Sequence, residues 1–167
     1  ESAAATQSVF AALNQNFSPD DLFEFEETFS LPKEDLERIV GTNDPSMCLK
    51  SPQFCAEASL DVQYMISTAP HSPTTFWSMQ GVDPDLFIRR ILDVGDDDTP
   101  PLVHSISYGG PERLFPPESV KRLDEEFAKM GLRGLTVVVA SGDDGVAGSQ
   151  ARFSQSLCKY SPSFPAS

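Results

Sequence analysis

The sequence has little positive charge: 12 lysine and arginine residues stand against 25 aspartate and glutamate residues, for a formal net charge of −13. This excess of acid argues against nucleic acid or an anionic membrane surface as a partner. Long apolar runs are also missing, and the N-terminus has neither the basic nor the apolar region of a signal peptide. We therefore expect no membrane span, and a targeting segment that was removed or lies upstream.

Histidine is scarce too, since the chain contains only two. His71 falls in a proline-flanked turn, and His104 lies within a stretch typical of a strand. Neither is accompanied by the Gly-x-Ser-x-Gly turn that presents a nucleophilic serine. A Ser-His-Asp triad is therefore not indicated, and we expect His104 to be a satisfied residue of a sheet rather than a catalytic base.

Cysteine occurs three times, an odd number that cannot be fully paired within the chain. Cys48 and Cys55 flank a short loop and can close a small disulfide, which leaves Cys158 free or paired outside the chain. The alternative is three reduced thiols in the core. Asn16 begins an Asn-Phe-Ser glycosylation sequon, and together with a disulfide it favours a secretory or lysosomal history.

The composition is that of a globular protein. Apolar residues make up 40% of the 167 residues and phenylalanine occurs twelve times, which does not fit a disordered chain. The length suits one domain or a piece of a larger one.

Hydrophobic periodicity and turn residues divide the chain into helices and strands. Helices are predicted over residues 6–17, 18–29, 55–68, 83–91 and 117–130, with a short helical piece near Pro32. Strands are predicted over residues 38–41, 74–79, 102–108 and 134–140, the last as a run buried on both faces of a sheet. The residues of the second helix expected in the core are Leu22, Phe23, Phe25 and Phe29. This order is typical of an α/β domain whose parallel sheet is flanked by helices on both faces.

Glu57 and Asp61 lie four residues apart in a predicted helix, so both fall on one face, one turn apart. Two like charges so placed repel, and burial of the pair would raise the pKa of one carboxyl group. A solvated helix face is the commoner explanation of such spacing. The apolar residues around the pair instead predict a helix that is buried all round.

A glycine-rich turn after the last predicted strand holds Asp143 between Gly142 and Gly145. The ordinary explanation is an acid that caps local amides. The turn nevertheless lies at the carboxyl end of a strand, where α/β domains place their chemistry.

Three motifs resemble those of the sedolisins, the serine-carboxyl peptidases, in residue types, order and spacing. They are Glu-Ala-Ser-Leu-Asp-Val-Gln-Tyr at 57–64, Ser-Ile-Ser-Tyr-Gly at 105–109 and Ala-Ser-Gly-Asp-Asp-Gly at 140–145. The resemblance implies a subtilisin-like α/β fold, in which residues 1–167 are a single partial domain, the N-terminal part of a peptidase catalytic domain. That family carries its nucleophilic serine in a later Gly-Thr-Ser-Ala segment, which does not occur here. The chain alone is therefore expected to be inactive.

The resemblance also implies roles for individual residues. Glu57 would take the proton from the serine hydroxyl, Asp61 would orient Glu57, and Asp143 would donate a hydrogen bond to the oxyanion. A carboxylate can replace histidine as the base in an acidic medium, because burial raises the pKa of a glutamate toward the working pH. The substrate backbone would add as an extra β-strand along residues 105–109, with Tyr108 beside the scissile bond or simply packed as an aromatic. The residues implied in substrate binding are Ser105, Ser107, Tyr108, Gly109, Ser141 and Gly142.

The implied partners are a peptide or protein substrate and a second chain or C-terminal segment that carries the serine. No cofactor or metal site is expected within this chain, and the calcium ion that the resemblance implies belongs to the missing C-terminal part. The expected location is secreted, lysosomal or vacuolar. The alternative is a non-catalytic peptide-binding or scaffold module descended from a sedolisin. The sequence leaves open whether N-terminal tripeptides are released or internal bonds are cut.

Overall fold

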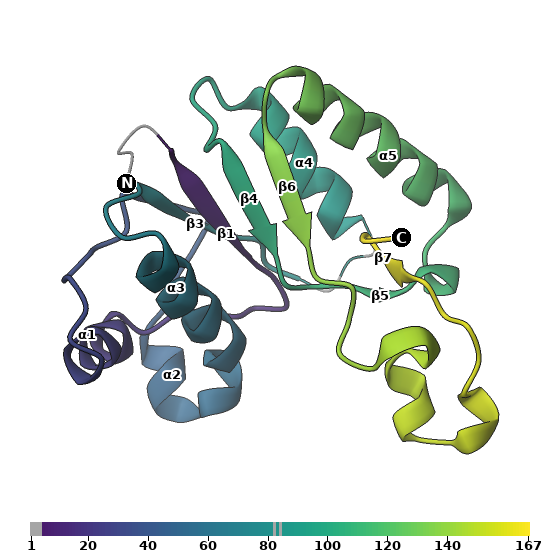
Figure 1. Cartoon of the computed structure of the whole chain (residues 1–167), viewed down its shortest axis with the longest axis horizontal. Coiled ribbons are helices and arrows are strands. Elements are labelled where there is room, and N and C mark those ends of the chain that lie inside the picture. The colour runs from purple at the N-terminus through teal and green to yellow at the C-terminus, as the bar shows by residue number, and fades with distance from the viewer. Residues whose placement is uncertain (1–4, 82, 84) are drawn as a thin grey trace.

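Five parallel strands form one sheet in the order β2-β3-β1-β4-β6 (Figure 1). This arrangement is seen in a computed structural model, which describes residues 5–81, 83 and 85–167. The strands are β1 Gln7–Ala11, β2 Arg38–Val40, β3 Thr74–Ser78, β4 Val103–Ile106 and β6 Thr136–Val139. A separate antiparallel ribbon pairs β5 Gly110–Pro111 with β7 Ser163–Phe164.

Helices cover both faces of this sheet (Figure 1). On one face lie α1 Pro19–Thr28 and α3 Ala56–Thr68, and on the other lie α4 Leu86–Asp96 and α5 Pro117–Leu132. The short α2 Ser46–Lys50 and a 3-10 turn at Pro52–Phe54 lead into α3. Further 3-10 turns are Glu112–Leu114, Gly145–Ala147, Ser149–Arg152 and Gln155–Leu157. The prediction of a parallel α/β fold with helices on both faces is confirmed.

Alternation along the strands divides the core into two apolar layers. Val9 of β1 lies in register with Phe76 of β3, and both belong to the layer under α1 and α3. Their chain neighbours Phe10 and Trp77 belong to the layer under α4 and α5. Successive residues of a strand point to opposite faces, so a central strand needs apolar residues at nearly every position.

The predicted helix over residues 6–17 is wrong, because its first half is the central strand β1. All five residues of β1 are buried, which fills both of its faces. Gln7 and Ser8 tolerate this burial because their side chains are hydrogen-bonded to other strands. A short apolar run does not distinguish a strand covered on both sides from a buried helix.

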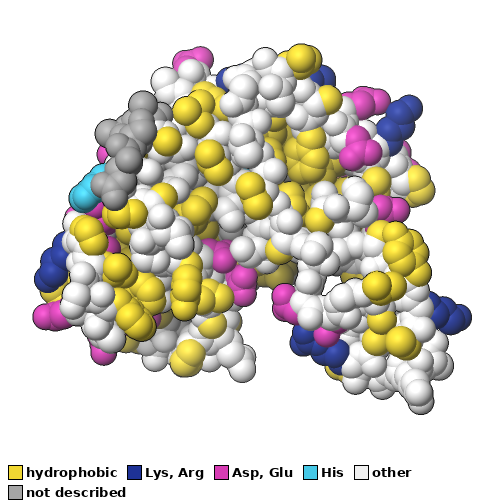
Figure 2. All heavy atoms as spheres, viewed as in Figure 1, with side chains coloured by type: hydrophobic (Ala, Val, Ile, Leu, Met, Phe, Trp, Pro, Cys, Tyr) yellow, Lys and Arg dark blue, Asp and Glu magenta, His cyan; other side chains and the backbone are white. Residues whose placement is uncertain are grey.

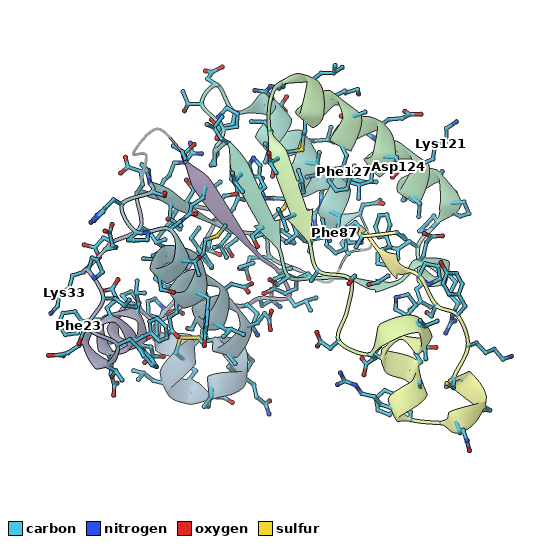
Figure 3. All side chains as sticks on the ribbon, viewed as in Figure 1. Phe23, Lys33, Phe87, Lys121, Asp124 and Phe127 are labelled. Atoms are coloured by element: carbon cyan, nitrogen blue, oxygen red, sulfur yellow. A yellow bond between two sulfur atoms is a disulfide. The ribbon has the colours of Figure 1, made fainter. Side chains whose placement is uncertain are left out.

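α1 begins as predicted, since the side chain of Ser18 accepts a hydrogen bond from the backbone N–H of Asp21. Its buried stripe is narrower than predicted, because Phe23 and Phe29 are about half exposed or more. The amine of Lys33 lies 3.6 Å from the ring centroid of Phe23, a cation–π contact that partly covers the ring (Figure 3). The helical piece predicted near Pro32 does not form, since residues 31–36 have no helical hydrogen-bond pattern.

The prediction that residues 134–140 are buried on both faces is wrong. β6 is the last strand of the described sheet, and exposed and half-buried residues alternate along it. Val137 and Val139 pack against the layer under α4 and α5. Val138 points to the opposite face and is 55% exposed, because the described helices of that face do not reach β6.

α5 forms where the sequence predicts it, whereas α4 runs from Leu86 to Asp96 instead of over residues 83–91. Pro84, predicted at the start of α4, lies outside the described residues. α5 runs to Leu132 rather than ending at Gly131, and Gly134, with φ of +80°, follows it in the left-handed conformation that commonly ends helices. No helix in the described ranges is long and apolar enough to cross a membrane.

Cys48 and Cys55 form a disulfide, so the first of the two predicted alternatives is confirmed, and Cys158 is free and exposed. Asn16 of the sequon is only 6% exposed. Its Nδ2 donates to the carbonyl oxygen of Asn14 at 3.1 Å, and its Oδ1 accepts from the backbone N–H of Asp44 at 2.8 Å. Because a glycan would have to replace these contacts, the sequon gives no support for a secretory history.

A buried polar cluster joins β1, β4 and α4. Ser8 Oγ and His104 Nδ1 are 2.7 Å apart, and the guanidinium of Arg90 lies 3.2 Å and 3.1 Å from these two atoms. Arg90 also stacks on Trp77, with 3.8 Å between its Cζ atom and the ring centroid. Arg90 can only donate, so His104 Nδ1 is an unprotonated acceptor. Burial and the neighbouring Arg90 lower the pKa of His104 to about 3. The prediction that His104 lies in a strand is confirmed, since it pairs with β1 and β6 within β4. The prediction that it is satisfied holds only for Nδ1, because Nε2 is buried without a hydrogen-bond partner among the described residues.

Candidate active site

The strand order changes direction between β1 and β4. The chain leaves β1 to build β2 and β3 on one side of it, and then adds β4 and β6 on the other. In open parallel sheets, ligands bind outside the carboxyl ends of the strands at such a switch point. The segments that follow β4 and β6, residues 107–109 and 140–143, both start from this end of the sheet.

α3 brings Glu57 and Asp61 to the same end. The buried face of this helix consists of Ala58, Val62 and Ile66. The prediction of a helix buried all round is wrong, because Leu60 is 48% exposed. The carboxylate pair lies at the border between the buried and the exposed face, and both residues are half-buried. This position leaves both carboxyl groups partly desolvated, which raises the pKa of an acid, and still in reach of solvent.

Asp61 is held from the sheet. The hydroxyl of Ser107, immediately after β4, donates to Oδ1 of Asp61 at 2.9 Å. Burial raises the pKa of Asp61 to about 6, and the neighbouring Glu57 adds to this rise, whereas the bond from Ser107 opposes it. Burial and the nearby Asp143 likewise raise the pKa of Glu57. The pair therefore retains a proton in mildly acidic solution, as expected of two carboxyl groups that share a desolvated site.

A cavity of about 240 Å³ lies between the ends of β4 and β6. Among the residues that line it are Ser107, Tyr108, Gly109, Ser141, Gly142 and Asp143. Figure 2 shows a deep notch at the lower edge of this view, between the part that holds α2 and α3 and the 3-10 turns that follow β6, with acidic side chains on both of its walls. The structure thus brings six of the nine predicted site residues to one hollow. Ser107 and Asp143 connect it to the carboxylate pair of α3.

Asp143 extends into water from the turn after β6, and its side chain is 91% exposed. Gly142, just before it, has φ of +86°, a backbone conformation that favours glycine. Arg152 lies near this turn, with 4.0 Å between its Nη2 atom and Asp143 Oδ2, and it forms a closer ion pair with Asp144. Sequence reasoning missed Arg152, and the one available signal was the second acid of the turn, Asp144.

Ser105 has no free edge to offer to a substrate strand. It lies within β4, paired in register with Val9 of β1 on one side and Val138 of β6 on the other. Strand addition needs unpaired backbone groups, so the prediction that substrate adds along residues 105–109 is wrong for its first part. Residues 107–109 lie past the ladder of β4, and all three line the cavity.

Tyr108 packs as an aromatic residue and also borders the cavity, whereas its position beside a scissile bond stays a prediction. Its ring meets Phe10 edge-on with 5.5 Å between centroids, and the residue also lines the cavity. Gly109 is required by a close approach, because an added Cβ atom would lie 2.6 Å from the carbonyl oxygen of Phe164 in β7. The ribbon of β5 and β7 thereby fixes the path of the chain beyond the cavity wall.

Within the described ranges, no group of three His, Cys, Asp or Glu side chains could hold a metal ion. The described residues therefore offer no fit for the calcium ion that the resemblance implies. That ion stays a prediction for the C-terminal part.

No family model matches the chain. Tripeptidyl-peptidase 1 of Dictyostelium discoideum is 33% identical over 167 residues, which cover 97% of this chain and 26% of that protein. Tripeptidyl-peptidase 1 of Canis lupus familiaris is 33% identical over 161 residues, with coverages of 93% and 27%. The solved structure of Pseudomonas sedolisin, a serine-carboxyl proteinase complexed with two molecules of pseudo-iodotyrostatin, matches with a TM-score of 0.69 at 22% identity. That match covers 99% of this chain and 46% of that one.

These matches support the sedolisin family that the three motifs predicted, and the chain has the fold of Pseudomonas sedolisin. Within the family, its sequence is similar to tripeptidyl-peptidase 1. It spans about a quarter of the length of these curated relatives.

Proposed function

We propose that the chain is the N-terminal part of the catalytic domain of an acid-acting serine-carboxyl peptidase. The carboxylate pair supports this proposal: Glu57 and Asp61 both have raised pKa values and stand beside a cavity at the carboxyl ends of β4 and β6. A general base works best when its pKa is near the working pH, so such a pair suits hydrolysis in acid. The name of the relatives, tripeptidyl-peptidase 1, supports a peptide or protein as the substrate.

In the proposed reaction, a serine from a C-terminal segment or a second chain attacks the carbonyl carbon of the scissile bond. Its hydroxyl proton passes to Glu57 while the carbonyl electrons move to the oxygen, which becomes an oxyanion. Asp61 donates a hydrogen bond to Glu57 and orients it. Protonated Asp143 donates to the oxyanion. The carbonyl then re-forms, the C–N bond breaks and Glu57 gives its proton to the leaving amine, which leaves an acyl-enzyme that water hydrolyses. Because Asp143 is open to water here, its role requires that substrate or further chain cover it.

The proposed location is secreted, lysosomal or vacuolar. The Cys48–Cys55 disulfide supports an oxidising compartment, because disulfides persist there and are rare in the cytosol.

The chain on its own should hydrolyse no peptide at any pH, because activation without a nucleophile gives no acyl-enzyme. The test is release of amines from a mixed peptide library by the isolated chain and by the full-length protein, with intact mass excluding a second polypeptide in the former. If the homogeneous chain hydrolyses peptides, and still does so after Ser141→Ala and Ser149→Ala, the proposal that the nucleophile lies outside this chain is contradicted. A full-length protein that binds the peptides and cleaves none would favour the peptide-binding scaffold instead.

Asp143 should stabilise the oxyanion only while it is protonated. Replacement by alanine and replacement by asparagine should therefore have different effects. In the full-length protein, Asp143→Ala should lower kcat by roughly 10²–10³, the usual effect of losing one oxyanion donor. Asp143→Asn keeps a donor of similar size that does not titrate, so it should retain activity and move the alkaline limb of the kcat profile to higher pH. Asp98→Asn, in an exposed acidic turn, is the control. An alkaline limb that stays in place in Asp143→Asn, with Ala no worse than Asn, would remove Asp143 from the oxyanion site.

A further inference from the structure

The two oxygens of the Asp61 carboxyl group lie in different surroundings. Oδ1 accepts a hydrogen bond from Ser107 Oγ at 2.9 Å. Oδ2 is buried and has no hydrogen-bond partner among the described residues. A buried polar atom without a partner is costly, and a proton on Oδ2 with an acceptor for that proton would remove this cost.

Ser107 decides which oxygen can carry this proton. A serine hydroxyl has a single hydrogen, and here it is directed at Oδ1 of Asp61. A second hydrogen on Oδ1 would face the first, so a proton on Asp61 is favoured on Oδ2. Glu57, one turn earlier on the same face of α3, is the neighbouring group that can accept it.

We propose that Ser107 is a positioning residue for the carboxylate pair. Its hydroxyl holds Oδ1 of Asp61, so the proton that the pair shares lies on Oδ2. Asp61 donates this proton to Glu57 in a hydrogen bond. This inference rests on the proposed function of Glu57 as the general base. It differs from a role of Ser107 in binding substrate backbone, because the contact is made by the hydroxyl and its partner is a side chain of this protein.

The charged and titratable groups around the pair are consistent with this assignment. From α3 itself, Glu57 faces Asp61, and from the end of β4 the phenol of Tyr108 is near both. Burial, together with these two carboxyl groups, raises the pKa of Tyr108, so the phenol stays neutral. Asp143 approaches Glu57 from the turn after β6. The neighbours of the pair are thus acidic or neutral, and Ser107 is the donor that opposes the rise in the pKa of Asp61.

Loss of the Ser107 hydroxyl should shift the pKa of Asp61 in a defined direction. A hydrogen bond to the ionised form lowers the pKa of an acid, so Ser107→Ala should raise the pKa of Asp61 further and move the titration of the pair to higher pH. The acid limb of the kcat profile should move in the same direction, because Glu57 must lose its proton before it can act as a base. The misaligned pair should also lower the maximum of kcat, by about tenfold to a hundredfold.

The experiment compares Ser107→Ala, Ser107→Thr and Ser67→Ala in the full-length protein, with kcat and KM measured across the acid range. Ser67 lies on the same helix as the pair, and its hydroxyl bonds only to a backbone carbonyl of that helix, at 3.1 Å. We expect Ser107→Ala to lower kcat and shift the acid limb with KM nearly unchanged, Ser107→Thr to restore both, and Ser67→Ala to match the unmodified protein. Ser107→Cys, which keeps the volume and donates weakly, replaces Ser107→Ala if the latter does not fold.

A raised KM with an unmoved acid limb in Ser107→Ala would overturn the positioning role in favour of substrate binding. Equal behaviour of Ser107→Ala and Ser67→Ala would overturn it as well. Failure of the proposed function is a separate result, since it would appear as full activity of Glu57→Gln whatever the Ser107 variants do.

Discussion

Glu57→Gln in the full-length protein should lower kcat by at least about a hundredfold, and by as much as about 10⁴, the range that general acid–base catalysis contributes. The change keeps the shape of the side chain and removes its basicity. Asp61→Asn should also lower kcat by at least about a hundredfold, because an amide at this position cannot share a proton with Glu57. Neither change removes apolar contacts, so both variants should fold normally.

The measurement is kcat on a peptide substrate in acid, with thermal unfolding of each variant as the test of folding. Glu24→Gln, on the exposed face of α1, is the matched control and should leave kcat unchanged. Near-normal turnover of both Glu57→Gln and Asp61→Asn would return the pair to the solvated helix face that its spacing alone first suggests.

His104→Leu should destabilise the protein by about 3 kcal/mol, because it removes an acceptor from the guanidinium of Arg90, which is 1% exposed. Ser8 would then be the one hydrogen-bond partner left to the guanidinium among the described residues, and the buried group cannot turn to water instead. His104→Gln keeps a polar side chain that can accept the hydrogen bond, so it should cost less than His104→Leu. Chemical denaturation near neutral pH measures both differences, and equal losses in the two variants would show that packing, rather than the hydrogen bond, is what His104 contributes.

The same cluster predicts how stability depends on pH. The pKa of His104 is lowered in the folded state to about 3, so the unfolded chain binds a proton more readily as the pH falls below about 6.5. The contribution of His104 to the free energy of unfolding is therefore complete above about pH 6.5. It is lost progressively as the pH falls toward 3, by up to about 4 kcal/mol. His104→Gln should flatten this decline. The raised pKa of Asp61 acts in the opposite sense, since its protonation on acidification favours the folded state.

Local geometry explains which features the sequence could predict. The shared face of Glu57 and Asp61 follows from helix spacing alone, and α3 runs to Thr68 as the sequence predicts. Ser18 likewise predicted the start of α1, because an N-cap acts within one turn. The positions of chemistry after β4 and β6 follow from the general rule for parallel sheets.

Features that depend on distant neighbours could not be predicted in this way. The bond between Ser107 and Asp61 joins residues 46 positions apart, and no periodicity signals it. β1 resembled a helix because its two faces are covered by layers that the chain builds later. β6 had the composition of a strand buried on both sides, and only the sheet order revealed that one face lacks a cover among the described helices.

The open side of β6 has a consequence for how the chain behaves in isolation. Its residues Thr136–Val139 combine three valines with a threonine, and its outer backbone groups have no partner strand in the described sheet. Such an edge is a template for pairing with the same strand of another molecule, and neither charge nor proline within β6 interrupts it. In isolation, the chain therefore presents this strand as a surface prone to aggregation until its outer edge is covered.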